Sequence, residues 1–177
     1  MSSHQRTVLL LVGFPGFILK AQARLAMERL SSKTAIAPSI EMFVGGTLDC
    51  DQIKREDWDV LILSGVLRTA SEGESFFSAV QRHNPVIATI HVKLSGHTYA
   101  QELIRSGVAC DDVRQQVSSR HEHFYGGLNI PSLEDLLRRR SSGYVEVDGV
   151  GGETLHPAIA KIVGGIISHH EQLSLGV

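Results

Sequence analysis

Three short runs of apolar and β-branched residues constrain the fold of this chain more than any other feature. They are Thr7–Val12, Asp59–Leu63 and Val86–Ile90, and polar and apolar side chains do not alternate along them. Strands buried on both faces of a parallel sheet have this composition, because helices cover both faces. The runs therefore predict neighbouring strands in one central sheet, with Thr7–Val12 in the middle.

Weaker strand patterns occur at Ile40–Val44 and Tyr144–Val147, and segments of helical periodicity separate the strands. Helices are expected at Phe17–Leu30, Ser75–Arg82, Thr98–Ser106 and Leu155–His169, with one more that begins at Ser132 as its N-cap. This alternation predicts an α/β fold with a doubly wound, mostly parallel sheet of the flavodoxin-like or amidotransferase-like type. A chain of 177 residues is expected to form it as a single domain, residues 1–177.

The composition of the chain limits the kinds of molecule that it is expected to bind. The 17 Lys and Arg nearly balance 19 Asp and Glu, so no strong field attracts nucleic acid or an acidic membrane. No signal peptide and no run long enough to span a membrane is recognised, which predicts a cytoplasmic protein with a small-molecule partner. The 2 cysteines, Cys50 and Cys110, form no Cys-x-x-Cys pattern, so neither a disulfide framework nor a metal site is expected. No cofactor is expected either.

The segment Pro85–His97 is the strongest candidate for a functional corner. His91 is expected where a buried strand ends, before a tight turn and a helix. Ligands of open α/β sheets lie beyond the carboxyl ends of the strands, so a residue at this corner faces the site. A purely structural alternative is that His91 only caps the strand through hydrogen bonds.

The turn after the first strand reads Gly13-Phe14-Pro15-Gly16 and invites a phosphate-loop interpretation. The Lys-[Ser/Thr] pair that would hold phosphate and magnesium is absent, because Phe17-Ile18-Leu19 occupies its place. A nucleotide-binding role is therefore disfavoured.

These segments together resemble the ThiJ/PfpI superfamily of class I glutamine-amidotransferase-like proteins. The resemblance rests on Gly-Phe-Pro-Gly-Phe after the first strand, Ser64-Gly65 after Asp57–Leu63, the corner at Pro85–Leu94 and Gly-Gly-Glu-Thr before the last helix. Members are commonly homodimers, which the resemblance implies here. Catalytic members pair a corner cysteine with an acidic residue of the first turn, which favours the thiolate.

This chain lacks both parts of that device. His91 stands at the corner, and Phe17, Ile18 and Leu19 follow the first turn, so chemistry based on a thiolate is not expected. The resemblance implies a divergent member, a small-molecule-binding domain or pseudoenzyme. The alternative is a lyase, hydratase, isomerase or cyclase that uses His91 as general acid and base, with His121 and His123 as further candidates.

A degenerate receiver domain is a third class, but acidic residues are missing where phosphotransfer needs them. His121 and His123 have a structural alternative as solvated loop residues, and Glu153 and Thr154 have one as helix caps. The residues expected to line the ligand site come from the strand ends and the Gly-rich turns: Gly13, Phe14, Pro15, Ile18, Ser64, Gly65, Val92, Tyr125, Glu153 and Thr154.

Overall fold

The computed structural model describes residues 5–13, 17–33, 39–55, 57–93, 96–105, 107, 109–115, 129–148 and 152–174. The strands are β1 (Thr7–Gly13), β2 (Ile40–Val44), β3 (Val60–Ser64), β4 (Val86–Lys93) and β5 (Gly143–Asp148). The helices are α1 (Phe17–Lys33), α2 (Cys50–Arg55), α3 (Ala70–Val80), α4 (Gly96–Arg105), α6 (Asn129–Arg140) and α7 (Pro157–Ser174). A 3-10 turn, Gln81–His83, follows α3, and residues 110–115 are also helical.

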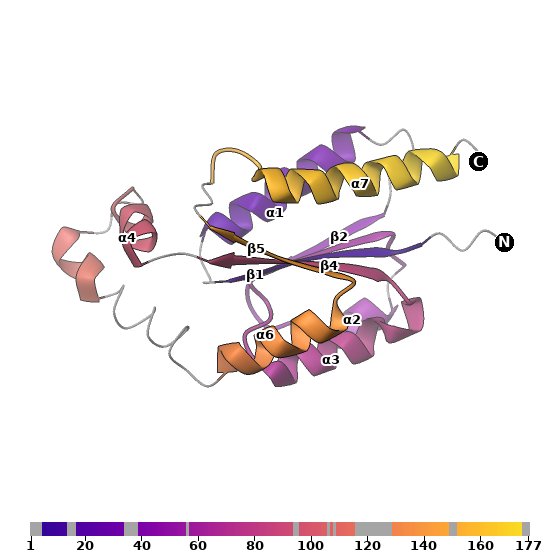
Figure 1. The fold of residues 1–177 in the computed structure, drawn as a ribbon, viewed down its shortest axis with the longest axis horizontal. Helices are drawn as coiled ribbons and strands as arrows, with labels where there is room; N and C mark the ends of the chain where they lie inside the picture. Colours follow the sequence, from indigo (N-terminus) through magenta and orange to yellow (C-terminus); the bar gives the residue numbers. More distant parts are fainter. Residues whose placement is uncertain are drawn as a thin grey trace.

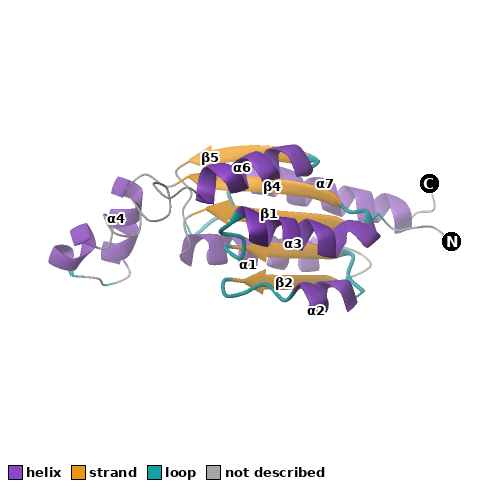
Figure 2. Ribbon diagram, turned by 90° about the horizontal axis from the view of Figure 1, so that it is seen from below, coloured by secondary structure: helices purple, strands orange, loops and turns teal. Residues whose placement is uncertain are grey.

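All strands pair in parallel in a 5-stranded sheet of order β2-β3-β1-β4-β5, as Figure 2 shows. The doubly wound parallel sheet predicted from the sequence is confirmed, and β1 lies between β3 and β4 as expected. Within this class the strand order differs from the flavodoxin-like order, in which the first strand lies between the second and third.

Helices cover both faces of the sheet (Figure 1). Alternate residues of β1 point to opposite faces, so Leu9 and Leu11 pack on the side of α1 and α7, while Leu10 and Val12 pack on the side of α3 and α6. Both cores are apolar, and every residue of β1 is buried. This explains why the β1 sequence shows no polar alternation.

The first residues of α3 and α6 differ from those predicted, and local sequence features explain the differences. α3 begins five positions before the expected Ser75, because Thr69 caps it and forms a reciprocal capping box with Glu72. The N-cap predicted at Ser132 is wrong, since α6 begins at Asn129. Pro131 does not end that helix, because the first-turn N–H groups have no intrahelical acceptor and proline lacks this donor.

β4 extends to Lys93, and this corrects the placement of His91. His91 lies within the strand and not at its end, so it does not stand at a strand-to-helix corner. In Figure 1, α4 lies beyond the carboxyl ends of the strands, where the chain leaves β4. Among the helices of the described ranges, none has both the length and the apolar character that a membrane span requires.

Candidate functional site

His91 is held deep beneath α6 by its place in β4. It pairs in register with Val12 of β1 on one side and with Glu146 of β5 on the other. Its side chain lies on the face of the sheet that α6 covers and is only 3% exposed. A polar ring this deeply buried needs hydrogen-bond partners, so its contacts decide what it can do.

One nitrogen of the ring is satisfied and the other is not. The Tyr144 hydroxyl of β5 and the His91 Nδ1 atom form a hydrogen bond of 2.7 Å. The two rings meet edge to face, with their centroids 6.2 Å apart. The His91 Nε2 atom is buried and has no hydrogen-bond partner among the described residues. The bond to Tyr144 thus orients the ring and leaves Nε2 available.

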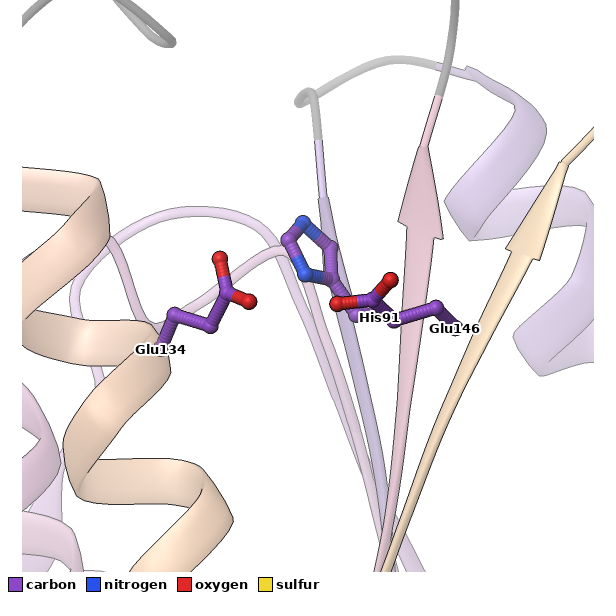
Figure 3. Close-up of side chains that lie close together, drawn as sticks. All are labelled: His91, Glu134 and Glu146. Atoms are coloured by element: carbon purple, nitrogen blue, oxygen red, sulfur yellow. The ribbon is translucent and has the colours of Figure 1, made fainter.

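Two carboxylates approach the imidazole from different elements (Figure 3). Glu134 comes from α6 and Glu146 from β5, and one donor atom of each lies within 4.8 Å of the others and of a His91 ring nitrogen. The carboxylates also bind cations. Lys93 Nζ lies 2.8 Å from Glu146, and the Arg138 guanidinium lies 2.8 Å from Glu134 and also contacts Glu146.

The electrostatics keep His91 neutral. Burial lowers the pKa of His91, the negative charges of Glu134 and Glu146 oppose this effect, and Lys93 and Arg138 add to it. Burial also raises the pKa of the Tyr144 hydroxyl, so it stays protonated. The hydrogen bond from Lys93 lowers the pKa of Glu146, which keeps that carboxylate ionised. With two carboxylates facing two cations, the cluster is close to neutral.

A narrow recess opens beside the ring, and its walls are Val12, His91, Leu133, Glu134 and Leu137. The recess is too tight to admit a water molecule in this conformation. A ligand group would enter it only if side chains of α6 move aside.

The recess lies at a topological switch point. The chain leaves β1 into α1 on one face of the sheet, whereas the elements after β4 return through α6 on the other face (Figure 1). Adjacent parallel strands whose connections diverge leave a crevice at their carboxyl ends, the place where open α/β sheets bind ligands. Val12 and His91 lie on these two strands, side by side.

Some predicted ligand residues turn out to have structural roles. A Cβ atom at Gly13 would lie 2.4 Å from the Val92 carbonyl oxygen, so the close approach of β1 and β4 requires glycine there. Ile18 and Val92 are buried in the core on the side of α1 and α7, opposite His91. Gly65 takes a φ of +64° and donates its N–H to the Leu11 carbonyl, which ends β3.

The structure does not bring the other predicted residues to His91. Ser64 is buried at the end of β3, and by alternation its side chain points to the side of α1. Glu153 and Thr154 are exposed, and the Thr154 carbonyl accepts a hydrogen bond of 2.8 Å from the buried Gln22 amide. Phe14, Pro15, His121, His123 and Tyr125 lie outside the described residues.

Neither cysteine takes part in the cluster. Cys50 begins α2, which connects β2 to β3, and burial raises the pKa of its thiol. Cys110 is exposed in the helical segment 110–115. A raised thiol pKa disfavours the thiolate that nucleophilic chemistry needs.

The residues that sequence reasoning missed are Tyr144, Glu146, Glu134, Lys93 and Arg138. A signal for part of this set was available, because Tyr144 and Glu146 alternate along one strand and His91 and Lys93 along another. Only the pairing and register of β4 with β5 place these four on one face, and the sequence does not specify that register. Glu134 and Glu146 are distant from His91 in the sequence, and they converge on it only in the fold.

Comparisons with known proteins add no family assignment. No protein-family model and no curated protein matches the chain. Among solved structures it is similar to the tunicamycin resistance protein of Deinococcus radiodurans, with 14% identity and a TM-score of 0.44 over 93% of this chain and 95% of that one. It is also similar to a de novo designed protein of the PLOOP2X3_50 fold, with 12% identity and a TM-score of 0.36 over 69% of this chain and 95% of the other.

Proposed function

We propose that this protein is a small-molecule-binding α/β domain whose ligand docks at the switch point between β1 and β4 and bonds to His91. The observation that carries the proposal is the buried Nε2 atom of His91, which has no partner among the described residues, on a residue that lines the recess beneath α6. An unpaired buried polar atom costs about 1–3 kcal/mol, and a ligand that pairs with it relieves this cost.

The surroundings favour a small ligand group without net charge. The recess walls are mainly Val12, Leu133 and Leu137, and the carboxylates nearby already face Lys93 and Arg138. Neutral imidazole can donate or accept a hydrogen bond at Nε2, depending on its tautomer. A carbonyl, amide or hydroxyl group on an apolar body is therefore the chemistry that suits this site.

The proposal includes a divergent ThiJ/PfpI-like origin without the nucleophilic cysteine, and the homodimer that the resemblance implies. Cys50 lies in α2 and burial raises the pKa of its thiol, and both observations support the loss of family-type thiolate chemistry. The strand order, which is not the flavodoxin-like order, weighs against this origin. Light scattering of the purified chain tests the dimer.

A second candidate is a cysteine-independent lyase, hydratase, isomerase or cyclase. The Tyr144–His91 hydrogen bond favours it, because a catalytic base is commonly oriented by a third group in this way. If His91 transfers a proton, His91→Ala should reduce turnover by about 2 to 4 orders of magnitude. If the protein only binds, the same change should weaken affinity about 2- to 13-fold, the effect of one hydrogen bond of about 0.5–1.5 kcal/mol.

A fragment screen monitored by NMR of the histidine ring resonances tests the binding function. Fragments that dock at the proposed site should shift the His91 resonances and bind more weakly to the His91→Ala variant. His97→Ala is the matched control, because His97 is exposed on α4. Hits that leave His91 unperturbed and bind His91→Ala with unchanged affinity would overturn the proposal.

A further inference from the structure

His91, Glu134 and Glu146 bring three metal-type donors together from β4, α6 and β5 (Figure 3). One donor atom of each lies within 4.8 Å of the other two. Ligands of a tetrahedral zinc ion, each about 2.0–2.2 Å from the metal, lie about 3.3–3.6 Å apart. The Glu134 and Glu146 side chains would therefore have to rotate toward His91 to bring the donors to bonding distance.

The state of His91 is an independent observation that points to a ligand. His91 is only 3% exposed, and its Nε2 atom has no partner in the described part of the chain. In the tautomer whose Nδ1–H donates to the Tyr144 oxygen, Nε2 keeps its lone pair. Histidines that bind metals are held in this way, by a hydrogen bond at the other ring nitrogen.

Lys93 and Arg138 already neutralise the two carboxylates, and this limits how tightly a metal can bind. Their side chains are 40% and 47% exposed, respectively, so both can swing into solvent when a cation displaces them. Ion pairs at this exposure contribute little stability. The cluster can therefore exchange its two organic cations for one metal ion, with a lower affinity than an unpaired acidic site would have.

We propose that His91, Glu134 and Glu146 bind one divalent transition-metal ion, with zinc as the best match to one imidazole and two carboxylate ligands. Three protein ligands leave a coordination position open, as in catalytic zinc sites. The inference rests on the proposed ligand site and deepens it: with the metal bound, a small-molecule ligand would meet the open coordination position in place of the His91 Nε2 atom.

Calorimetric titration of the full chain with zinc chloride, without any small molecule, tests this inference. The native protein should bind one zinc equivalent saturably at this site. Glu134→Gln and Glu146→Gln keep the side-chain shape, and each should weaken binding about 10-fold or more. Glu28→Gln is the matched control, since Glu28 is an exposed carboxylate that pairs with Arg24 on α1.

The Lys93→Met variant is expected to change the zinc affinity in the opposite direction from the glutamine variants. It keeps the apolar stem but removes the ammonium group that competes for Glu146, so zinc should bind several-fold more tightly than to the native protein. Far-ultraviolet circular dichroism verifies that each variant is folded. If these side chains only stabilised the fold, Lys93→Met would not tighten zinc binding.

Two results would overturn the metal site. One is the absence of saturable zinc binding by the native protein, and the other is zinc binding that both glutamine variants leave unchanged, as expected if only surface histidines bind. Neither result would change the conclusion drawn from the fragment screen about small-molecule binding. Failure of the screen with normal zinc binding would overturn the small-molecule function instead.

Discussion

The Tyr144 hydroxyl forms a hydrogen bond with the Nδ1 atom of His91, so the pair can be tested as a unit. Tyr144→Phe removes the hydroxyl and leaves both ring nitrogens unpaired in a buried place. We expect the free energy of unfolding, measured by urea denaturation, to fall by about 1–3 kcal/mol.

The double variant His91→Leu with Tyr144→Phe provides the control for this pair. Replacing both partners by apolar groups removes the unsatisfied atoms, so the double variant should lose less stability than the sum of the single losses. Strictly additive losses would show that the hydrogen bond does not couple the two residues.

Gly13 tests the close approach of β1 and β4 next to His91. A Cβ atom at this position would lie 2.4 Å from a backbone oxygen of Val92, which cannot rotate away. Gly13→Ala should therefore reduce the free energy of unfolding by about 1–3 kcal/mol or more.

Gly164→Ala is the matched change in open space. A Cβ atom at Gly164 in α7 would have no described heavy atom within 4 Å apart from its own helix backbone, so alanine should stabilise the helix by about 0.5–1 kcal/mol. Equal effects of the two substitutions on thermal unfolding would contradict the packing role given to Gly13.

At the scale of elements, α3 supports the site because its residues pack against α6, the helix that carries Glu134. A Cβ atom at Gly73 would lie 2.7 Å from a Leu136 methyl carbon, which shows how closely the two helices approach. α6 in turn covers the recess with Leu133 and Leu137. The N-cap of α3 therefore helps to hold α6 in place over His91.

Thr69→Ala tests this support. It removes the side chain that accepts the Glu72 N–H and breaks the capping box. The free energy of unfolding should fall by about 0.5–2 kcal/mol. Ser71→Ala, an exposed position in the first turn of the same helix, should cause no loss, because alanine is the better helix former. A loss as large as that of Thr69→Ala would refute the capping role.

Strands and helices were predictable from the sequence to the extent that local pattern determines them. β1, β3 and β4 consist mostly of apolar and β-branched residues, so the central sheet could be inferred from composition alone. The end of β4 could not, because Val92 and Lys93 continue the strand through pairing with Gly13 and Asp148 of neighbouring strands. Pairing between distant segments is not encoded in local periodicity.

The candidate site shows the same division. His91 was singled out because it follows a buried apolar run, but its partners Tyr144, Glu134 and Glu146 come from later elements. They meet it through the register of β5 and the packing of α6. Gly13, Ile18 and Val92 were expected at the ligand site because they lie at strand ends and turns. The structure places Gly13 at the close approach of β1 and β4, and Ile18 and Val92 in the core on the face opposite His91.

At the scale of the whole molecule, a second histidine links segments at the amino ends of the strands. The Arg6 guanidinium contacts both His83 and Asp57. It also lies 5.5 Å from the centre of the Trp58 ring, which packs edge to face on His83 at 5.1 Å. These contacts join the entries to β1 and β3 with the turn after α3.

The charge state of His83 therefore affects the stability of the fold. Burial lowers the pKa of His83, and the positive charges of Arg6 and Arg82 lower it further. The folded state thus binds this proton less readily than the unfolded state does. Stability contributed by neutral His83 is present above its unfolded pKa of about 6.5 and is lost as pH falls from there through the folded pKa.

We expect the free energy of unfolding, measured by urea denaturation, to decrease as pH is lowered from about 7 to about 5. His83→Gln removes the titrating group and should make this decrease shallower. The pKa of His91 is also lowered, so part of the decrease in stability should remain in the variant. His97→Gln, at an exposed position of α4, is the control and should retain the native pH profile. A His83→Gln profile parallel to the native one would show that the Arg6 cluster does not couple proton binding to folding.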